Sequence, residues 1–124
     1  MNVPFPQLNL VVLRSADIDR SVKFYEAMGL RFAKHAHGSG PEHYASENNG
    51  FVFEIYPVTA KAGPTTGTRI GFRVDDVDGV VKLLSEISGV VVTPPADSEW
   101  GRRTVVKDLD GHTVELVTHG NKGL

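Results

Sequence analysis

The sequence predicts an α+β fold in which two βαβββ modules form a curled mixed sheet around a cavity. Three observations support this prediction. Helix-like and strand-like segments follow one another in the same order in both halves of the chain, and an aspartate precedes each expected helix. The last expected strand of each half also carries a glutamate, Glu54 or Glu115. We expect one domain over residues 1–124, with units 8–60 and 68–119 and a connector at 61–67.

The first half reads as a strand, a helix and three further strands. An apolar run at 8–13 is short enough for a buried strand, and Asp17 can cap a helix in which apolar residues recur at helical spacing. Gly29 then ends this helix. The three remaining strands are expected at 30–37, 43–47 and 51–56, because a Gly-Ser-Gly-Pro segment and an Asn-Asn-Gly turn separate them.

The second half repeats this order after a connector rich in Gly, Pro and Thr. A strand is expected at 68–74, followed by a helix that Asp76 can cap and Gly89 can end. A short strand is expected at 90–93, and longer ones at 101–107 and 112–118. Two consecutive prolines precede the second of these strands, and an Asp-Gly turn precedes the third.

The two halves also match residue by residue. An offset of 59 aligns Arg14 with Arg73 and Asp17 with Asp76, and the offset becomes 61 in the last strands, where Glu54 matches Glu115. Since both the period and the order of the elements agree, we interpret the chain as an internal duplication.

Composition narrows the possible partners. The 124 residues carry 13 Lys and Arg against 15 Asp and Glu, and the basic residues are scattered, so we expect no nucleic acid partner. The sequence contains no cysteine, which suits a cytoplasmic protein without disulfides. Residues 1–7 lack a basic start followed by an apolar run, and no stretch is long enough to cross a bilayer. We therefore expect neither export nor a membrane partner.

Strand alternation places polar side chains opposite the apolar ones. In the strand at 68–74, Arg69 and Arg73 share the face away from the apolar residues, and Glu54 and Glu115 do the same in the last strands. If each half curls its sheet and the halves pair, both glutamates line one concave surface. This surface is the expected ligand site.

At this level the chain resembles the vicinal oxygen chelate superfamily, which includes glyoxalase I, extradiol dioxygenases and bleomycin-resistance proteins. The resemblance covers nearly the whole chain and rests on two groups of residues: Asp17-Ile18 with Ser21, Phe24-Tyr25 and Gly29-Leu30, and Trp100-Gly101 with Asp108-Leu109-Asp110-Gly111-His112 and Val114-Glu115-Leu116. Leu109 stands where many relatives carry proline. The resemblance implies the paired βαβββ fold and a homodimer.

In metal-bearing relatives, four residues from the first and last strands of the two halves close on one divalent ion. The matching positions here are Leu10, Glu54, Arg69 and Glu115. Leucine has no lone pair to donate and arginine stays protonated, so half of this set cannot coordinate a metal. We therefore expect no metal cofactor at this position.

The five histidines are the remaining candidates for metal ligation. His35 and His37 share a strand face, with His43 on a neighbouring strand, but their spacing matches no metal motif. We interpret them as surface imidazoles. For His112 and His119 we expect a structural or solvent-exposed role.

Two side chains near the expected site have alternative interpretations. Arg69 can form an ion pair with Glu54 or Glu115, or it can bind an anionic ligand, and desolvation of a lone buried ion pair favours the ligand role. Trp100 is the only tryptophan and can form an aromatic wall of a cavity, a core contact or a dimer contact. The sequence does not decide whether Arg102 or Arg103 points inward.

These observations favour a protein that binds a small organic molecule without a metal. Its expected ligand-binding residues are Leu10, Glu54, Tyr56, Arg69, Arg73, Trp100 and Glu115. The alternative is an enzyme of the lyase, isomerase or dioxygenase type, either with a relocated metal or with Glu54 or Glu115 acting as acid or base. A regulatory or immunity module is a third possibility, but no exposed apolar stripe supports it. The sequence assigns no catalytic residue.

Overall fold

The computed structural model describes residues 5–119, so both ends of the expected domain, residues 1–4 and 120–124, lie outside the described part. The first half contains β1 (Leu10–Ser15), α1 (Ile18–Ala27), β2 (Ala33–His35), β3 (His43–Asn48) and β4 (Phe51–Pro57). The second half contains β5 (Arg69–Arg73), α2 (Val77–Leu84), β6 (Val91–Val92), β7 (Ala96–Ser98), β8 (Gly101–Lys107) and β9 (Thr113–Thr118).

Both helices begin where their aspartates predict. The Oδ1 atom of Asp17 accepts the backbone N–H of Arg20 at 3.1 Å, and Asp76 accepts that of Gly79 at the same distance. Each carboxylate satisfies an N–H group that has no partner within the helix and places negative charge at the positive end of the helix dipole. The helix α2 ends at Leu84, earlier than Gly89 implied, and turns follow it.

The strands form two mixed sheets, one from each half. The N-terminal sheet has the order β1-β4-β3-β2, and the C-terminal sheet has the order β5-β9-β8-β6 with β7 also paired to β8. In each sheet the first strand runs parallel to the last, and the other pairs are antiparallel. Two helices on two mixed sheets confirm the expected α+β fold.

Two strands differ from the expectation. The strand β2 covers only residues 33–35 of the expected 30–37, because it pairs with β3 over three residues. The strand β7 was not expected, since it follows Pro94-Pro95 directly and pairs with β8 over only three residues.

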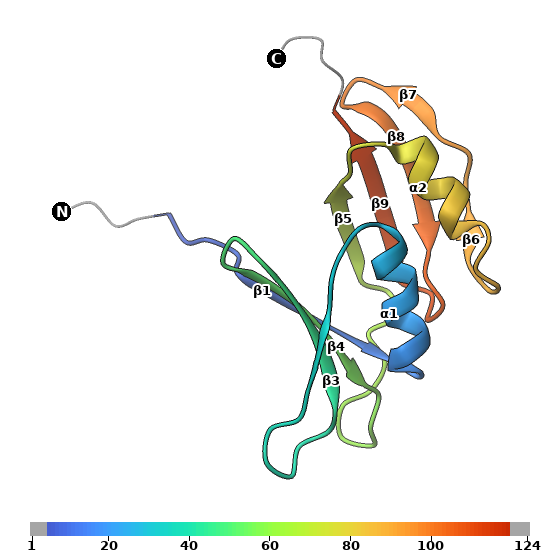
Figure 1. The fold of residues 1–124 in the computed structure, drawn as a ribbon. Coiled ribbons are helices and arrows are strands. Elements are labelled where there is room, and N and C mark those ends of the chain that lie inside the picture. Colours follow the sequence, from blue (N-terminus) through green and yellow to red (C-terminus); the bar gives the residue numbers. More distant parts are fainter. Residues whose placement is uncertain (1–4, 120–124) are drawn as a thin grey trace.

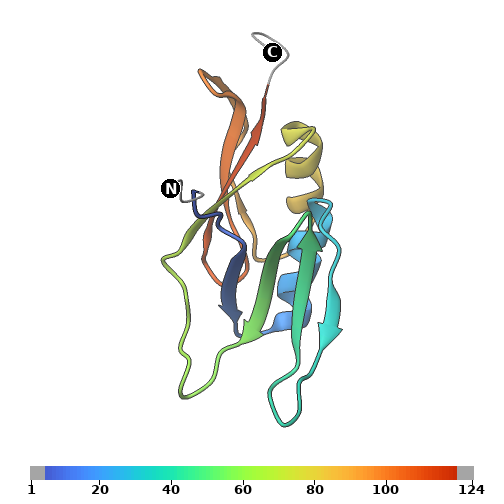
Figure 2. The same ribbon diagram turned by 90° about the vertical axis from the view of Figure 1, so that its left-hand side faces the viewer.

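The two helices lie on the same side of the molecule. Figure 1 shows α1 next to α2, and Figure 2 shows both helices behind the strands of the two sheets, so the opposite face of each sheet carries no helix among residues 5–119. The strands β1 and β5 form one edge of their respective sheets. Glu54 and Glu115, which alternate with core residues such as Ile55 and Leu116, therefore face the side away from the helices.

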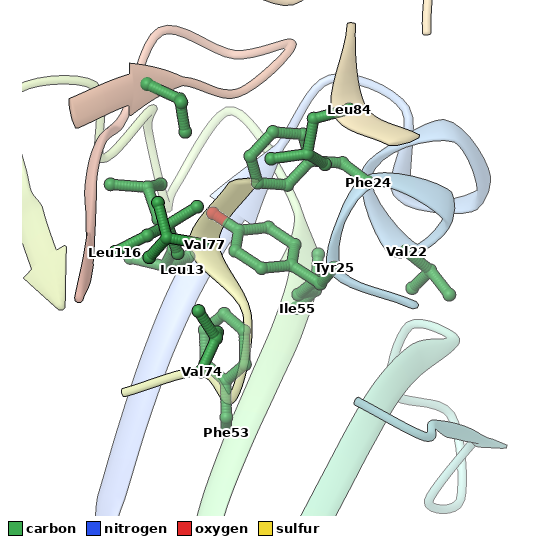
Figure 3. Close-up of a cluster of buried hydrophobic side chains, with 12 residues drawn as sticks. Leu13, Val22, Phe24, Tyr25, Phe53, Ile55, Val74, Val77, Leu84 and Leu116 are labelled. Carbon is green, nitrogen blue, oxygen red and sulfur yellow. The ribbon is translucent and has the colours of Figure 1, made fainter. Parts of the chain in front are cut away.

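Tyr25 joins the two halves in the core. Its side chain is fully buried, and its ring packs edge-on against Phe24 and Phe53 at centroid distances of 4.7 and 5.0 Å (Figure 3). Phe72 from β5 lies 6.1 Å from Tyr25 and 5.7 Å from Phe53. Burial of each such side chain stabilises the fold by about 1.5–3 kcal/mol. The core thus holds both sheets against α1.

Candidate functional site

A cavity of about 500 Å³ lies on the helix-free face of the C-terminal sheet. Strand register explains its walls, because Gly71 pairs with Glu115, and Val117 pairs with both Arg73 and Arg103. These positions share one face of β5, β9 and β8. The lining residues are Gly71, Phe72, Arg73, Trp100, Arg103, Glu115, Val117 and His119.

Glu115 lies between two arginines of this sheet. The Nε atom of Arg69 donates to its Oε2 atom at 2.8 Å, and Arg103 donates to its Oε1 atom. These hydrogen bonds, that from Arg69 first, lower the pKa of Glu115 from 4.5 to about 2. The carboxylate is therefore ionised at neutral pH, and both its oxygens already accept a donor. At neutral pH it has no proton to donate, and so low a pKa makes it a weak base.

Arg73 adds a third guanidinium to this surface. It is exposed at the cavity wall, and within residues 5–119 it makes no ion pair. Arg69, Arg73 and Arg103 bring three positive charges next to the single negative charge of Glu115. The excess positive charge favours an anionic group in the cavity.

Trp100 forms an open aromatic wall of the cavity. Its side chain is 63% exposed, on the turn between β7 and β8, where its backbone N–H donates to Ser98 Oγ at 3.2 Å. An aromatic face exposed beside charged groups is available to stack on a flat ligand. Of the possibilities left open by the sequence, a core contact is excluded.

The structure also distinguishes two neighbouring arginines. Arg103 points into the cavity toward Glu115, whereas Arg102 donates to Asp78 on α2 and to Asp97 on β7. Sequence reasoning missed Arg103, because Val105 and Val106 make both faces of β8 look apolar. Thr104 is buried on the core face of β8, so its neighbour Arg103 must lie on the opposite face, which lines the cavity.

The residues expected from the N-terminal sheet lie elsewhere. Leu10, Glu54 and Tyr56 are not among the residues that line the cavity. The Oε2 atom of Glu54 lies 3.7 Å from Nε2 of His43, and the Tyr56 ring stacks on the same histidine. Glu54 therefore does not line the cavity that Glu115 lines. The two glutamates belong to different sheets.

The four positions that hold a metal in relatives do not fit one here. Leu10 offers no donor atom, and Arg69 directs its guanidinium at Glu115. Both oxygens of Glu115 accept hydrogen bonds from arginine, so a cation would have to displace these contacts. Of these four positions, only Glu54 offers a carboxylate that has no arginine partner among the described residues.

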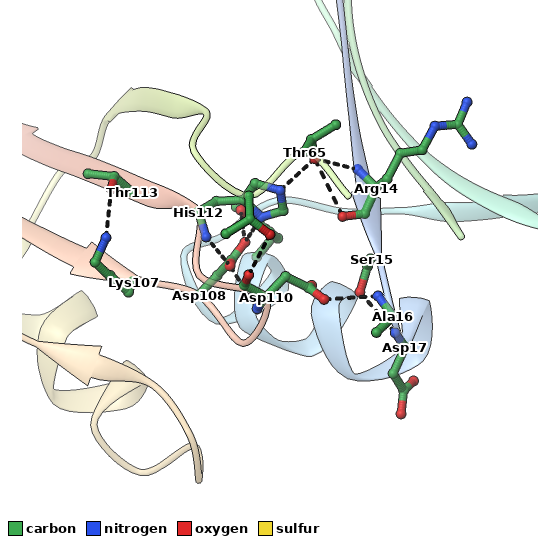
Figure 4. A network of polar contacts seen from close by, with 12 residues as sticks. Arg14, Ser15, Ala16, Asp17, Thr65, Lys107, Asp108, Asp110, His112 and Thr113 are labelled. Atoms are coloured by element: carbon green, nitrogen blue, oxygen red, sulfur yellow. Dashed lines mark hydrogen bonds and ion pairs between the residues drawn. The ribbon is translucent and has the colours of Figure 1, made fainter. Parts of the chain in front are cut away.

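A second polar cluster, Asp108 with Asp110 and His112, has possible ligand atoms within 4.8 Å of one another (Figure 4). The two oxygens of Asp108 already accept four hydrogen bonds, from Tyr25 Oη at 2.5 Å, from Nδ1 and the backbone N–H of His112, and from the backbone N–H of Asp110. Burial opposes ionisation of Asp108, but the hydrogen bonds from His112 and Tyr25 outweigh it and lower its pKa.

This cluster connects distant parts of the chain. Thr65 of the connector contacts His112 Nε2 at 2.6 Å and accepts the Arg14 backbone N–H at 2.9 Å, and Asp110 accepts the Ala16 N–H at 2.9 Å (Figure 4). The turn between β8 and β9 is thereby held against the start of α1. The cluster is structural, as expected for His112.

A second hollow, of about 620 Å³, lies between β5 and the N-terminal sheet. Its walls are mainly apolar and include Leu8, Val11, Leu30, Phe51 and Phe53, with Arg69 at β5. Leu8 is 73% exposed. The hollow leaves apolar surface next to an unpaired sheet edge.

The family model of the glyoxalase/bleomycin resistance protein/dioxygenase superfamily matches residues 7–116. The chain therefore belongs to this superfamily, as the sequence motifs predicted. No helix within residues 5–119 is long and apolar enough to cross a membrane.

The proteins to which the chain is similar differ in their described roles. The chain is 31% identical to an uncharacterized protein of Mycolicibacterium smegmatis, over 86% of this chain and 88% of that protein. It is 29% identical to a probable lactoylglutathione lyase of Vibrio parahaemolyticus, over 86% of each. The structure of TnmS3, an antibiotic binding protein from Streptomyces sp. CB03234, superposes with a TM-score of 0.72 at 24% identity, covering 96% of this chain and 100% of that one. The last comparison shows a shared fold.

Proposed function

We propose that the protein binds a small organic molecule with an acidic group and a flat apolar part, without a metal at the superfamily position. The observation that carries this proposal is the exposed Arg73 at the cavity wall, next to a glutamate that two other arginines already neutralise. A ligand carboxylate or phosphate can pair with Arg73, and Trp100 can stack on the flat part. A volume of about 500 Å³ suits a small molecule.

We also propose that the chain acts as a homodimer. An apolar surface that a second copy can cover lies at the hollow beside β5 and at Leu8 and Leu10. Leu10 is 48% exposed. Leu10, Glu54 and Tyr56 would then reach the ligand only from the partner's N-terminal sheet. Light scattering after size exclusion tests this proposal: the wild type should elute as a dimer, and Leu8→Glu should shift it toward the monomer.

The proposed ligand class can be tested by thermal unfolding with a panel of aromatic acids, acidic antibiotics and glutathione conjugates. Each acid is paired with its neutral amide or ester as a matched control. We expect some acids to raise the melting temperature, since a ligand that binds the folded state stabilises it, and the neutral analogues to act far less. Equal shifts with the neutral analogues, or no shift at all, would contradict the proposal.

An enzyme of the same superfamily is the second candidate. The similarity to a probable lactoylglutathione lyase favours it, and in a lyase, isomerase or dioxygenase Glu115 would be the base only if a substrate displaced its arginines and so raised its pKa. Formation of lactoylglutathione by the purified protein, with and without added divalent metal, separates the two candidates. Turnover would favour the enzyme, whereas binding without turnover favours the binding protein. Because the chain lacks cysteine, we also propose a cytoplasmic location. Because its two halves match in order and residues, we propose that it arose by internal duplication.

A further inference from the structure

Three histidines gather on the helix-free face of the N-terminal sheet, away from the cavity. His43 of β3 is 2% exposed, which differs from the surface position expected for it. The ring of His37 lies 5.2 Å from that of His43, and the ring of His35 lies 5.9 Å from both. Tyr56 of β4 stacks on His43 at 4.1 Å. Residues of three successive chain segments thus enclose one imidazole.

The hydrogen bonding of His43 leaves one ring nitrogen without a partner. Its Nδ1 atom lies 3.2 Å from the carbonyl oxygen of Pro41, which can only accept, so Nδ1 carries a hydrogen. In the neutral ring, Nε2 then presents a lone pair. This buried nitrogen has no hydrogen-bond partner among the described residues. Buried polar atoms are rarely left in this state without a bound species that satisfies them.

The group nearest to this nitrogen is also an acceptor. The Oε2 atom of Glu54 lies 3.7 Å from His43 Nε2, too far for a hydrogen bond. A zinc ion about 2.1 Å from each atom would subtend an angle of about 120° between them, close to the tetrahedral value. The two donors are therefore spaced to share one ion without moving.

The second ring nitrogen of His43 makes the hydrogen bond that metal-binding histidines usually make. The Nδ1–H group of His43 donates to a backbone carbonyl, which holds the ring and directs its Nε2 lone pair at the site. Two imidazoles on one tetrahedral ion have their ring centres about 5 Å apart, as His37 and His43 nearly do. His35 and His37 are exposed, so their side chains can rotate to complete the coordination.

The surrounding charge permits a cation. Glu54 supplies the negative charge. The guanidinium of Arg14 lies 5.2 Å from the Tyr56 ring centre and donates to the Pro57 carbonyl. Strand order places Tyr56 between Arg14 and His43, because β4 lies between β1 and β3. The arginine is thus held on the far side of the aromatic ring.

We propose that this cluster is a binding site for a divalent transition cation, with zinc as the preferred ion. His43 Nε2 and Glu54 Oε2 are the fixed ligands, and His37, His35 or water complete the set. Imidazole with one carboxylate is a donor set that zinc, nickel and cobalt favour over magnesium and calcium. The site shares only Glu54 with the superfamily position. Its test needs no ligand in the C-terminal cavity.

Calorimetric titration of the metal-stripped full chain with Zn²⁺ tests this site, and Co²⁺ absorption reports its geometry. We expect one equivalent to bind with micromolar or tighter affinity, and Co²⁺ to give the intense visible bands of a tetrahedral site. Glu54→Gln and His37→Ala should each weaken binding at least tenfold. The exposed His37 makes the second variant safe for folding, and circular dichroism checks both.

The matched controls are His119→Ala, which removes an exposed histidine from the other half, and Glu115→Gln, which removes the equivalent glutamate. Both should bind zinc as the wild type does. The proposal is overturned if the wild type binds no zinc at one equivalent. It is also overturned if the controls weaken binding as much as Glu54→Gln, or if nuclear magnetic resonance shows a proton bridging His43 and Glu54 in the presence of zinc.

Discussion

Arg103 donates a hydrogen bond to Glu115 from the neighbouring strand β8, while Arg69 donates to the other oxygen of the same carboxylate from β5. One carboxylate is thus held from both sides within a single sheet. The position of Glu115 corresponds to a metal ligand in metal-bearing relatives. Here the two guanidinium groups supply the positive charge, and Arg73 is left exposed at the cavity wall.

Arg73→Gln is expected to weaken binding of an acidic ligand about 10- to 100-fold, because a hydrogen bond to a charged group contributes about 1.5–3 kcal/mol. Arg102→Gln is the matched control, since Arg102 contacts Asp78 and Asp97 and does not line the cavity. Calorimetry of both variants with the same acid measures the difference. Equal losses in the two variants would show that net charge, rather than Arg73, determines the affinity.

Glu115 is expected to titrate at about pH 2, well below its ordinary value of 4.5. Because the pKa is lower in the folded state, ionised Glu115 stabilises the fold above about pH 4.5, and this contribution is lost as the pH falls toward 2. The carboxyl carbon resonance of Glu115 measures the pKa directly, and Arg69→Gln should raise it. A titration near 4.5 in the wild type would mean that the two ion pairs do not form in solution.

Tyr25→Phe is expected to lower the free energy of unfolding by about 1.5–3 kcal/mol, because buried Asp108 loses one donor and keeps its charge. The control is Tyr44→Phe, which removes a hydrogen bond of 2.6 Å to Asp19 at an exposed position. That change should cost under about 1 kcal/mol. Urea unfolding compares the two, and similar losses would argue against a structural role for the buried cluster.

Gly101→Ala is expected to destabilise the turn that carries Trp100 by more than about 2 kcal/mol. Gly101 has a φ angle of +121°, and an added Cβ would collide with the Thr118 carbonyl oxygen. Gly63→Ala, where a Cβ meets nothing within 4 Å, should change stability little. Thermal unfolding of both variants checks this, and a fully stable Gly101→Ala protein would contradict the turn geometry.

Local signals predicted the elements well, because they act within a few residues. Asp17 and Asp76 mark the helix starts in the sequence and cap them in the structure. Alternation correctly placed Arg69, Arg73 and Glu115 on one face of the second sheet.

Features that depend on distant packing could not be predicted in the same way. Alternation gives the face of each strand but not the angle between two sheets, so it grouped Glu54 with Glu115, although only Glu115 lines the cavity. The burial of His43 likewise depends on ring contacts with His35, on the neighbouring strand, and with His37, in the loop after that strand. No local pattern reports such a contact.

Trp100 fluorescence tests directly whether the cavity binds an acidic aromatic molecule, because Trp100 is the only tryptophan and lines the cavity. The measurement is a titration with an aromatic carboxylate selected by thermal shift, beside its neutral amide, in the wild type and in Arg73→Gln. If Arg73 pairs with the acid, emission changes saturably with a dissociation constant at least about tenfold lower for the acid than for the amide, and Arg73→Gln loses this preference. Equal affinity for acid and amide, or an emission unaffected by every acid, would contradict it.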